Sequence, residues 1–337
     1  MKAATGLYKN EPQSMAAKND MIRKEQKHKV NNWPDYNLSL KKRGSLEIWV
    51  SDDIEELWYE KDMINDGTGK PKKYTEKSIE LSYSLKLAFK QPLRQTEGFV
   101  NSIFKMAGLE AKCPDYSTLS RRCATLDLKI PKYKKSEVER EANKERIITL
   151  DSTGLKQYGK DEWHQEKHNV KPRRSWKKLH LVVDDNNIIQ GVELTEKSVH
   201  DSEVASDLLD QVQGLGDRYI ADGAYDTKKV YEEIERQNEN AKIVISPREN
   251  AVISDEWHAE RNKTLDIIDK HGYKGWYKIR KYGFQNYAEL SMQRYKKIIG
   301  PKMHSRDIRR QKNEAVIATS ILNKFTTLGM PISKKVA

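Results

Sequence analysis

Two aspartates follow short apolar runs that we expect to form buried strands. Asp151 comes directly after residues 147–150 in the stretch RIITLDSTGLK, and Asp222 follows the apolar part of RYIADGAYDT. In open α/β sheets, side chains at strand ends meet in one crevice outside the sheet. Two carboxylates held close together repel, and the pKa of each rises unless a positive charge lies between them. A hard divalent cation such as Mg²⁺ supplies that charge, so the pair predicts a metal site.

A simpler interpretation is open for each aspartate alone, because aspartate often caps the turn that it begins. The same device occurs twice, however, and each time at the end of an expected core strand of a basic chain. The repetition favours a shared site over two unrelated caps.

A third acidic ligand is expected from the last long helix, over residues 282–300. One row of this helix is apolar at helical spacing and should pack on the sheet: Phe284, Ala288, Met292, Tyr295 and Ile299. A second row lies roughly 90° around the helix and should face the crevice. Its members are Tyr282, Gln285, Glu289 and Lys296. A solvated Glu–Lys face is the alternative, although i,i+7 is not the spacing of a helical ion pair.

The composition favours a polyanionic partner. The chain has 62 Lys and Arg residues against 50 Asp and Glu, a net charge of +12 and a pI of about 9.3. Cations that meet phosphates release condensed counterions, which suits nucleic acid, although an ordinary lysine-rich surface gives the same balance. Cys113 and Cys123 lack zinc spacing and should be reduced thiols. Without a membrane-length apolar run or a signal peptide, we expect a cytoplasmic protein that does not contact membranes.

The chain divides by composition into five parts. Residues 1–30 are polar and lack periodicity, so we expect a disordered basic tail. Residues 129–145 are almost wholly charged and predict a linker, and residues 328–337 form a second tail. Between these parts lie a helical domain at 31–128 and an α/β domain at 146–327.

Three helices are predicted in the helical domain. YTEKSIELSYSLKLAF should begin at a Thr75 cap and TEGFVNSIFKMAGL at a Thr96 cap. CPDYSTLSRRCATL should form the third helix with Arg121 and Arg122 turned outward. Two helices joined by a short glycine-containing turn can form a helix-turn-helix that contacts DNA. Any small helical bundle offers the same pattern.

The segment 146–327 predicts the order β-β-β-α-β-α-β-α, which describes a mixed sheet with helices on its faces. KLHLVVDDNNIIQGVELT reads as a hairpin whose turn contains Asp184 and Asp185. DSEVASDLLDQVQGLG is expected to form one helix. His200 and Asp201 more plausibly cap that helix than bind a metal.

A basic segment, WHQEKHNVKPRRSWKKLH, spans residues 163–180. Cations in such a segment can follow a phosphate backbone. The candidates for this contact are His168, Arg173, Arg174 and Lys177. The alternative is an ordinary basic hairpin at the sheet edge.

The motifs around these residues resemble those of bacterial insertion-sequence transposases of the DDE class, in particular the family named for insertion sequence five. DSTGLK, EWH-x-x-KH, KLHLVVD, ELTE-x-x-VHDSEV and ADGAYDT carry the resemblance, which covers about residues 33–325. The glutamate region of this group has the pattern Y-x-x-R-x-x-x-E-x-x-x-x-x-x-K. Tyr282, Glu289 and Lys296 match it, whereas Gln285 stands at the arginine position.

The resemblance implies an RNase H-like catalytic domain in which Asp151, Asp222 and Glu289 are the catalytic and metal-binding residues. They would hold two Mg²⁺ ions about 3.5–4 Å apart, for which Mn²⁺ can substitute. Water would cut a strand at the transposon end, and the freed 3′-OH would then attack target DNA without a covalent protein–DNA intermediate. The implied substrate is double-stranded DNA, both the terminal inverted repeats and the target, and a homo-oligomer is expected on paired ends.

In the family pattern, the tyrosine, arginine and lysine handle phosphates near the cut, and the resemblance gives this role to Tyr282 and Lys296. Gln285 can donate a hydrogen bond to a phosphate but has neither the charge nor the bidentate fork of arginine. Arg280 or Arg294 could compensate. Two other functions stay open. One is a binding protein derived from such an element that no longer cuts, and the other is an RNase H-like nuclease acting alone.

Overall fold

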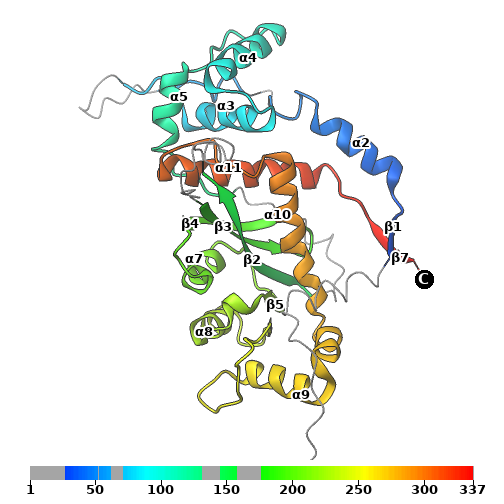
Figure 1. The fold of residues 1–337 in the computed structure, drawn as a ribbon. Coiled ribbons are helices and arrows are strands. Elements are labelled where there is room, and N and C mark those ends of the chain that lie inside the picture. Colours follow the sequence, from blue (N-terminus) through cyan, green and yellow to red (C-terminus); the bar gives the residue numbers. More distant parts are fainter. Residues whose placement is uncertain (1–26, 52, 62–70, 131–144, 158–175, 337) are drawn as a thin grey trace, which may run out of the picture.

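The architecture is a mixed α/β fold built on a five-stranded sheet (Figure 1). The computed structural model describes the chain except for residues 1–26, 52, 62–70, 131–144, 158–175 and 337. The strand order is β4-β3-β2-β5-β6. The strands are β2 (Ile147–Lys156), β3 (Trp176–Asp184), β4 (Ile189–Glu196), β5 (Arg218–Ala221) and β6 (Lys242–Ile245). The predicted mixed sheet is confirmed, and so is the predicted order of its elements as far as β6. After β6 the chain forms three long helices, where the sequence predicted only the one over residues 282–300.

Strand β2 is the centre of the sheet and is longer than predicted. It pairs antiparallel with β3 from Ile148 to Lys156, and parallel with β5 from Ile147 to Leu150. The prediction that this strand ends at Asp151 is therefore wrong. The continuous apolar run does stop there, but backbone pairing with a hairpin partner does not require apolar side chains on both faces.

Helices cover both faces of the sheet (Figure 1). On one face, α7 (Ala205–Leu209) and α8 (Lys228–Gln237) share an apolar cluster with the central strands. The other face carries α9 (Ala259–Ile279), α10 (Asn286–Ile298) and α11 (Ile308–Thr327). The sheet is thus buried between two helical layers, as expected where apolar residues dominate its central strands.

Two predicted helices are shorter than expected. The stretch 201–216 forms only the 3₁₀ turn η2 (Asp201–Glu203) and α7, which ends at Leu209, and Gly214 and Gly216 lie beyond it in the loop before β5. The last predicted helix begins with a second 3₁₀ turn, η4 (Tyr282–Gln285), before α10. Both changes place a tight turn close to a strand end.

The N-terminal segment forms a helical layer that packs against α11 (Figure 1). The helices of this layer are α3 (Glu76–Ala88), α4 (Leu93–Met106) and α5 (Tyr116–Cys123), while α2 (Trp33–Arg43) lies to one side of them (Figure 1). Thr75 caps α3 as predicted, and its side chain accepts a hydrogen bond from the Ser78 N–H. The predicted Thr96 cap is wrong, because α4 begins earlier and the Thr96 hydroxyl donates to the Pro92 carbonyl inside the helix. The helix-turn-helix interpretation is not confirmed.

The two ends of the described chain meet. β1 (Lys27–Val30) pairs antiparallel with β7 (Ser333–Val336) in a separate two-stranded ribbon. Both segments lie in parts whose polar composition predicts tails, and composition gives no signal for pairing between opposite chain ends. None of the helices in the described ranges is long and apolar enough to cross a membrane.

Candidate active site

Asp151 and Asp222 occupy equivalent positions on neighbouring parallel strands. The last registered pair of β2 and β5 is Leu150 with Ala221, and each aspartate is the next residue. Leu150 and Ala221 belong to the apolar cluster of α7 and α8. Because side chains alternate along a strand, both aspartates are expected to point toward the opposite face, where α9 and α10 lie.

Glu289 lies on α10, on that opposite face. Turn η4 contacts both β2 and β5, and α10 contacts β2. Two side-chain hydrogen bonds attach this helical segment to β2. Gln285 Nε2 donates to the Leu150 carbonyl at 2.8 Å, and Lys296 Nζ donates to Thr153 Oγ1 at 2.6 Å. Glu289 is therefore held between two points of attachment to the strand that carries the first aspartate.

The charges of neighbouring carboxyl groups act on both aspartates. Burial, followed by the charge of Asp222, raises the pKa of Asp151 to about 7, and Glu289 adds to this rise. Burial also raises the pKa of Asp222, again with a contribution from Glu289. The groups are thus close enough to repel in a poorly solvated environment, as the sequence predicted for the two aspartates.

A fourth carboxylate, Asp201, lies beside these groups. It is 8% exposed, and its two oxygens accept hydrogen bonds from Ser152 Oγ at 2.8 Å and from Lys178 Nζ at 2.9 Å. Its charge also contributes to the raised pKa values of Asp151 and Asp222. Asp201 thus joins β2 to β3 directly next to the first aspartate.

The sequence interpretation of Asp201 as a cap missed this contact. The His200 N–H donates to Glu203 Oε1 at 2.9 Å in a capping box, whereas the Asp201 side chain turns to the sheet. The motif SVHDSEV is compatible with both arrangements. Only the pairing of β2 with β3, which brings Ser152 opposite His180, distinguishes them, and no local pattern reports that register.

The donor set fits a hard divalent cation by its chemistry. Carboxylate oxygens are the ligands that Mg²⁺ prefers, and a cation would remove the repulsion that contributes to the raised pKa of Asp151. Within the described residues, however, no three His, Cys, Asp or Glu side chains stand close enough together to hold one ion.

The residues expected to handle phosphates near the cut differ in exposure. Lys296 is exposed. Tyr282 is 2% exposed and packs on the aromatic rings of α9, and Gln285 is equally buried with its amide on β2. Arg294 is buried and donates to a backbone carbonyl of α11 at 3.1 Å, and Arg280 is paired with Glu260. Of this set, Lys296 is the side chain open to a ligand.

The basic residues predicted to contact DNA away from the cut also differ in their exposure to solvent. Lys177 is buried and paired with Glu196. Arg121 is exposed at the end of α5, whereas Arg122 is partly buried and donates to a backbone carbonyl at 2.9 Å. The remaining predicted residues lie outside the described ranges: His168, Arg173 and Arg174.

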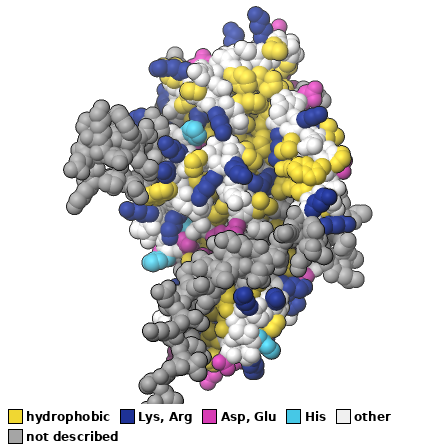
Figure 2. Space-filling model, turned by 45° about the vertical axis from the view of Figure 1, so that its right-hand side comes forward, with side chains coloured by type: hydrophobic (Ala, Val, Ile, Leu, Met, Phe, Trp, Pro, Cys, Tyr) yellow, Lys and Arg dark blue, Asp and Glu magenta, His cyan; other side chains and the backbone are white. Residues whose placement is uncertain are grey.

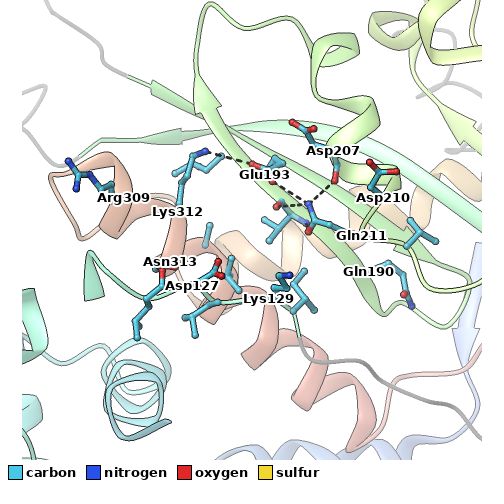
Figure 3. A pocket seen from close by; sticks show the side chains of 18 of the residues that line it. Asp127, Lys129, Gln190, Glu193, Asp207, Asp210, Gln211, Arg309, Lys312 and Asn313 are labelled. Carbon is cyan, nitrogen blue, oxygen red and sulfur yellow. Dashed lines mark hydrogen bonds and ion pairs between the residues drawn. The ribbon is translucent and has the colours of Figure 1, made fainter. Parts of the chain in front are cut away.

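A cleft of about 1070 Å³ lies between the segment after α5, strand β4, α7 and α11 (Figure 3). Its lining carries both signs of charge, including Asp127, Glu193 and Lys312, and none of the three carboxylates belongs to it. On the wall of this cleft, Gln211 Oε1 accepts a hydrogen bond from the Val192 N–H at 3.1 Å, and Gln211 Nε2 donates one to the Val192 carbonyl at 3.4 Å. This amide covers the edge of β4 where another strand would pair.

Carboxylates are ligands that hard divalent metal ions prefer, and enzymes that act on phosphodiesters with bound metal ions include nucleases and polymerases. A family model described as Transposase DDE domain matches residues 142–324, more than half of the chain. A second model with the same description matches residues 41–160. The chain therefore belongs to the transposases with a DDE domain. The matched regions include all three carboxylates and the N-terminal helices α3 to α5.

Proposed function

We propose that this protein is the transposase of an insertion sequence of the family named for insertion sequence five. It cuts double-stranded DNA at the terminal inverted repeats and joins the freed ends to target DNA. The observation that carries the proposal is geometric: Asp151 and Asp222 follow the last registered pair of β2 and β5, and Glu289 lies on the helix that Gln285 and Lys296 attach to β2. The net charge of +12 suits the substrate.

Asp151, Asp222 and Glu289 are the residues that would hold the metal, as two Mg²⁺ ions or Mn²⁺ in their place. When bound, the metal supplies Lewis acidity toward the phosphodiester and a water activated at neutral pH. The pKa of Asp151, raised to about 7 by burial and by Asp222, means that this carboxyl group releases a proton as the metal binds.

The surrounding residues position these groups. Gln285 fixes the start of the Glu289 helix on β2, and Asp201 fixes Ser152 beside Asp151. Lys296, which is exposed, contacts phosphates near the cut. We assign Tyr282 the structural role of packing η4 against α9. We give Arg294 no part in DNA binding, because its guanidinium is buried against α11.

DNA outside the cut is held by other basic groups and by a second subunit. Exposed Arg121 on α5 and the residues His168, Arg173 and Arg174 are the proposed contacts to flanking duplex. Two transposon ends have to be held together for joining, so we propose that the protein acts as a homo-oligomer on paired ends.

The test is a cleavage assay on labelled duplexes that carry the inverted repeats flanking the gene, in the presence of Mg²⁺. The parent should cut at the repeat end. The cutting rate of Asp222→Asn should fall by more than the ~10–100-fold loss of activity that substitutions outside the metal ligands usually cause. Asp127→Asn, at an exposed position on the distant cleft, is the matched control and should cut normally. Cutting that survives Asp222→Asn would contradict the proposal.

A second function is favoured by two observations. Gln285 stands at the arginine position of the family pattern, and within the described residues the carboxylates are not close enough to share an ion. A DNA-binding protein derived from such an element would bind the repeats without cutting them. Specific binding by the parent with no cleavage in either Mg²⁺ or Mn²⁺ would establish this second function.

A further inference from the structure

The two ends of the described chain form a basic projection that the catalytic site does not use. We call it the terminal arm and define it as residues 27–43 (β1 and α2) with residues 329–336 (β7 and the turn before it). It contains seven Lys and Arg residues against one Asp, so it carries +6 of the net charge of +12. The arm extends from one side of the molecule, beyond the C-terminal end of α11 (Figure 1).

The fold brings like charges of the arm together. The register of the ribbon places Lys29 directly opposite Lys334, and both side chains are exposed. Lys41 and Lys42 are exposed in the last turn of α2. Among the described residues, none of these four lysines forms an ion pair. Figure 2 shows dark blue side chains scattered over the side of the molecule from which the arm extends.

This arrangement is unfavourable for the isolated protein. Like charges directly opposite each other destabilise a strand pair, and a two-stranded ribbon is only marginally stable in water. Specific hydrogen bonds nevertheless fix its base. Asn32 donates through Nδ2 to the Met330 carbonyl at 3.0 Å and accepts through Oδ1 from the Ile332 N–H at 2.7 Å. Ser39 and Arg43 of α2 both donate to the carbonyl of Gly329.

We propose that the terminal arm is a contact surface for the sugar–phosphate backbone of duplex DNA. This inference rests on the proposed function for the identity of the polyanion. A row of phosphates would neutralise the opposed lysines, and the major groove is wide enough to admit a two-stranded ribbon. Lysine is a point charge without a bidentate fork, so the arm contributes affinity without reading sequence.

The test measures duplex affinity over a range of salt concentrations, with Ca²⁺ in place of Mg²⁺ to prevent cutting. In Lys29→Gln/Lys334→Gln, the slope of log affinity against log salt should fall by about 2, because two phosphate contacts are lost. Affinity near 0.1 M salt should fall about 10–100-fold, equally for repeat and random sequences. Lys29→Arg/Lys334→Arg keeps both charges and should restore the parent slope.

The control is Lys228→Gln/Lys229→Gln, which removes two exposed lysines from α8 on the far face of the sheet. Its slope should match that of the parent. A parent-like slope in the arm variant, while the parent still cuts, would overturn the arm proposal alone. Loss of slope in the arm variant of a protein that never cuts would support the arm and contradict the proposed catalysis. Binding of the arm to anionic lipid vesicles with an unchanged duplex slope would also overturn it.

Discussion

The carboxyl group of Asp151 is held in a state that is costly without a partner cation. Burial is the largest cause of its raised pKa, and Asp222, Glu289 and Asp201 add to it. The hydrogen bond from the Ser152 N–H acts in the other direction and lowers the pKa. Ionisation of an aspartate in this environment lowers the free energy of unfolding of the protein. Binding of a cation next to the carboxylate restores it.

We therefore predict that Asp151→Asn stabilises the metal-free protein at high pH. The unfolded chain releases this proton near pH 4, whereas the native state keeps it up to about pH 7. The native state thus binds more protons in this window, so parent stability falls as pH rises through it and stays low above pH 7. Removing the charge should raise the free energy of unfolding by up to about 4 kcal/mol at pH 8.

Urea unfolding in a chelating buffer at several pH values measures this effect. The gain should shrink toward zero below pH 4, where both states of the parent are protonated. Asp127→Asn at an exposed position is the control and should not change the pH profile. Identical profiles for the parent and Asp151→Asn would contradict the assignment of the raised pKa to this residue.

Residue types alone predicted the candidate site only in part. Asp151, Asp222 and Glu289 could be singled out because carboxylates next to apolar runs, or on one row of a helix, are visible in the sequence. Asp201 could not, because its partners Ser152 and Lys178 come from strands whose register is set by tertiary pairing. Local patterns describe neighbours along the chain, whereas these contacts join distant segments.

At the scale of elements, the attachment of α10 to β2 positions the helix glutamate. Gln285 and Lys296 bond β2 on either side of Glu289, and the Gln285 contact is fully buried. The resemblance predicted that Gln285 substitutes for an arginine on phosphate. Its amide instead donates to the Leu150 carbonyl, next to the first aspartate, so we interpret it as a positioning residue.

We predict that Gln285→Leu weakens metal binding and cutting without weakening DNA binding. Loss of the hydrogen bond removes one of the two side-chain attachments of this helical segment to β2 and frees its start, which should lower metal affinity about 10–100-fold. Mn²⁺ titration by calorimetry and duplex binding in Ca²⁺ measure the two effects separately. Gln293→Leu changes an exposed glutamine of the same helix and should leave both unchanged. Equal metal affinity for Gln285→Leu and the parent would remove the positioning role.

Element types were easier to predict than element boundaries. The hairpin of β3 and β4 and the Thr75 cap follow from local rules of turn and cap chemistry, and the structure contains both. The end of β2 and the start of α4 depend on what the chain packs against. Thr96 has the chemistry of a cap, but the preceding Pro92 already begins the helix and leaves the threonine inside it.

At the scale of the whole molecule, one apolar core joins the N-terminal helices to the catalytic sheet. The shared element is α11, whose Asn313 donates to the backbone carbonyls of Cys123, the last residue of α5, and of Leu126 just beyond it. Composition predicts two domains with a charged linker, but it does not show that they share a core. We expect the N-terminal layer to be fixed relative to the carboxylates, so that DNA bound to either part is placed relative to the other.

The proposed catalysis requires a metal bound among Asp151, Asp222 and Glu289, and iron-directed backbone cleavage tests this directly. Fe²⁺ takes the place of Mg²⁺, and ascorbate with peroxide then cuts the polypeptide next to the bound ion. We predict cuts near residues 151, 222 and 289 that excess Mg²⁺ suppresses and that disappear in Asp222→Asn but persist in Asp127→Asn. Cuts confined to other segments, or cuts at these positions that Asp222→Asn leaves unchanged, would contradict the account.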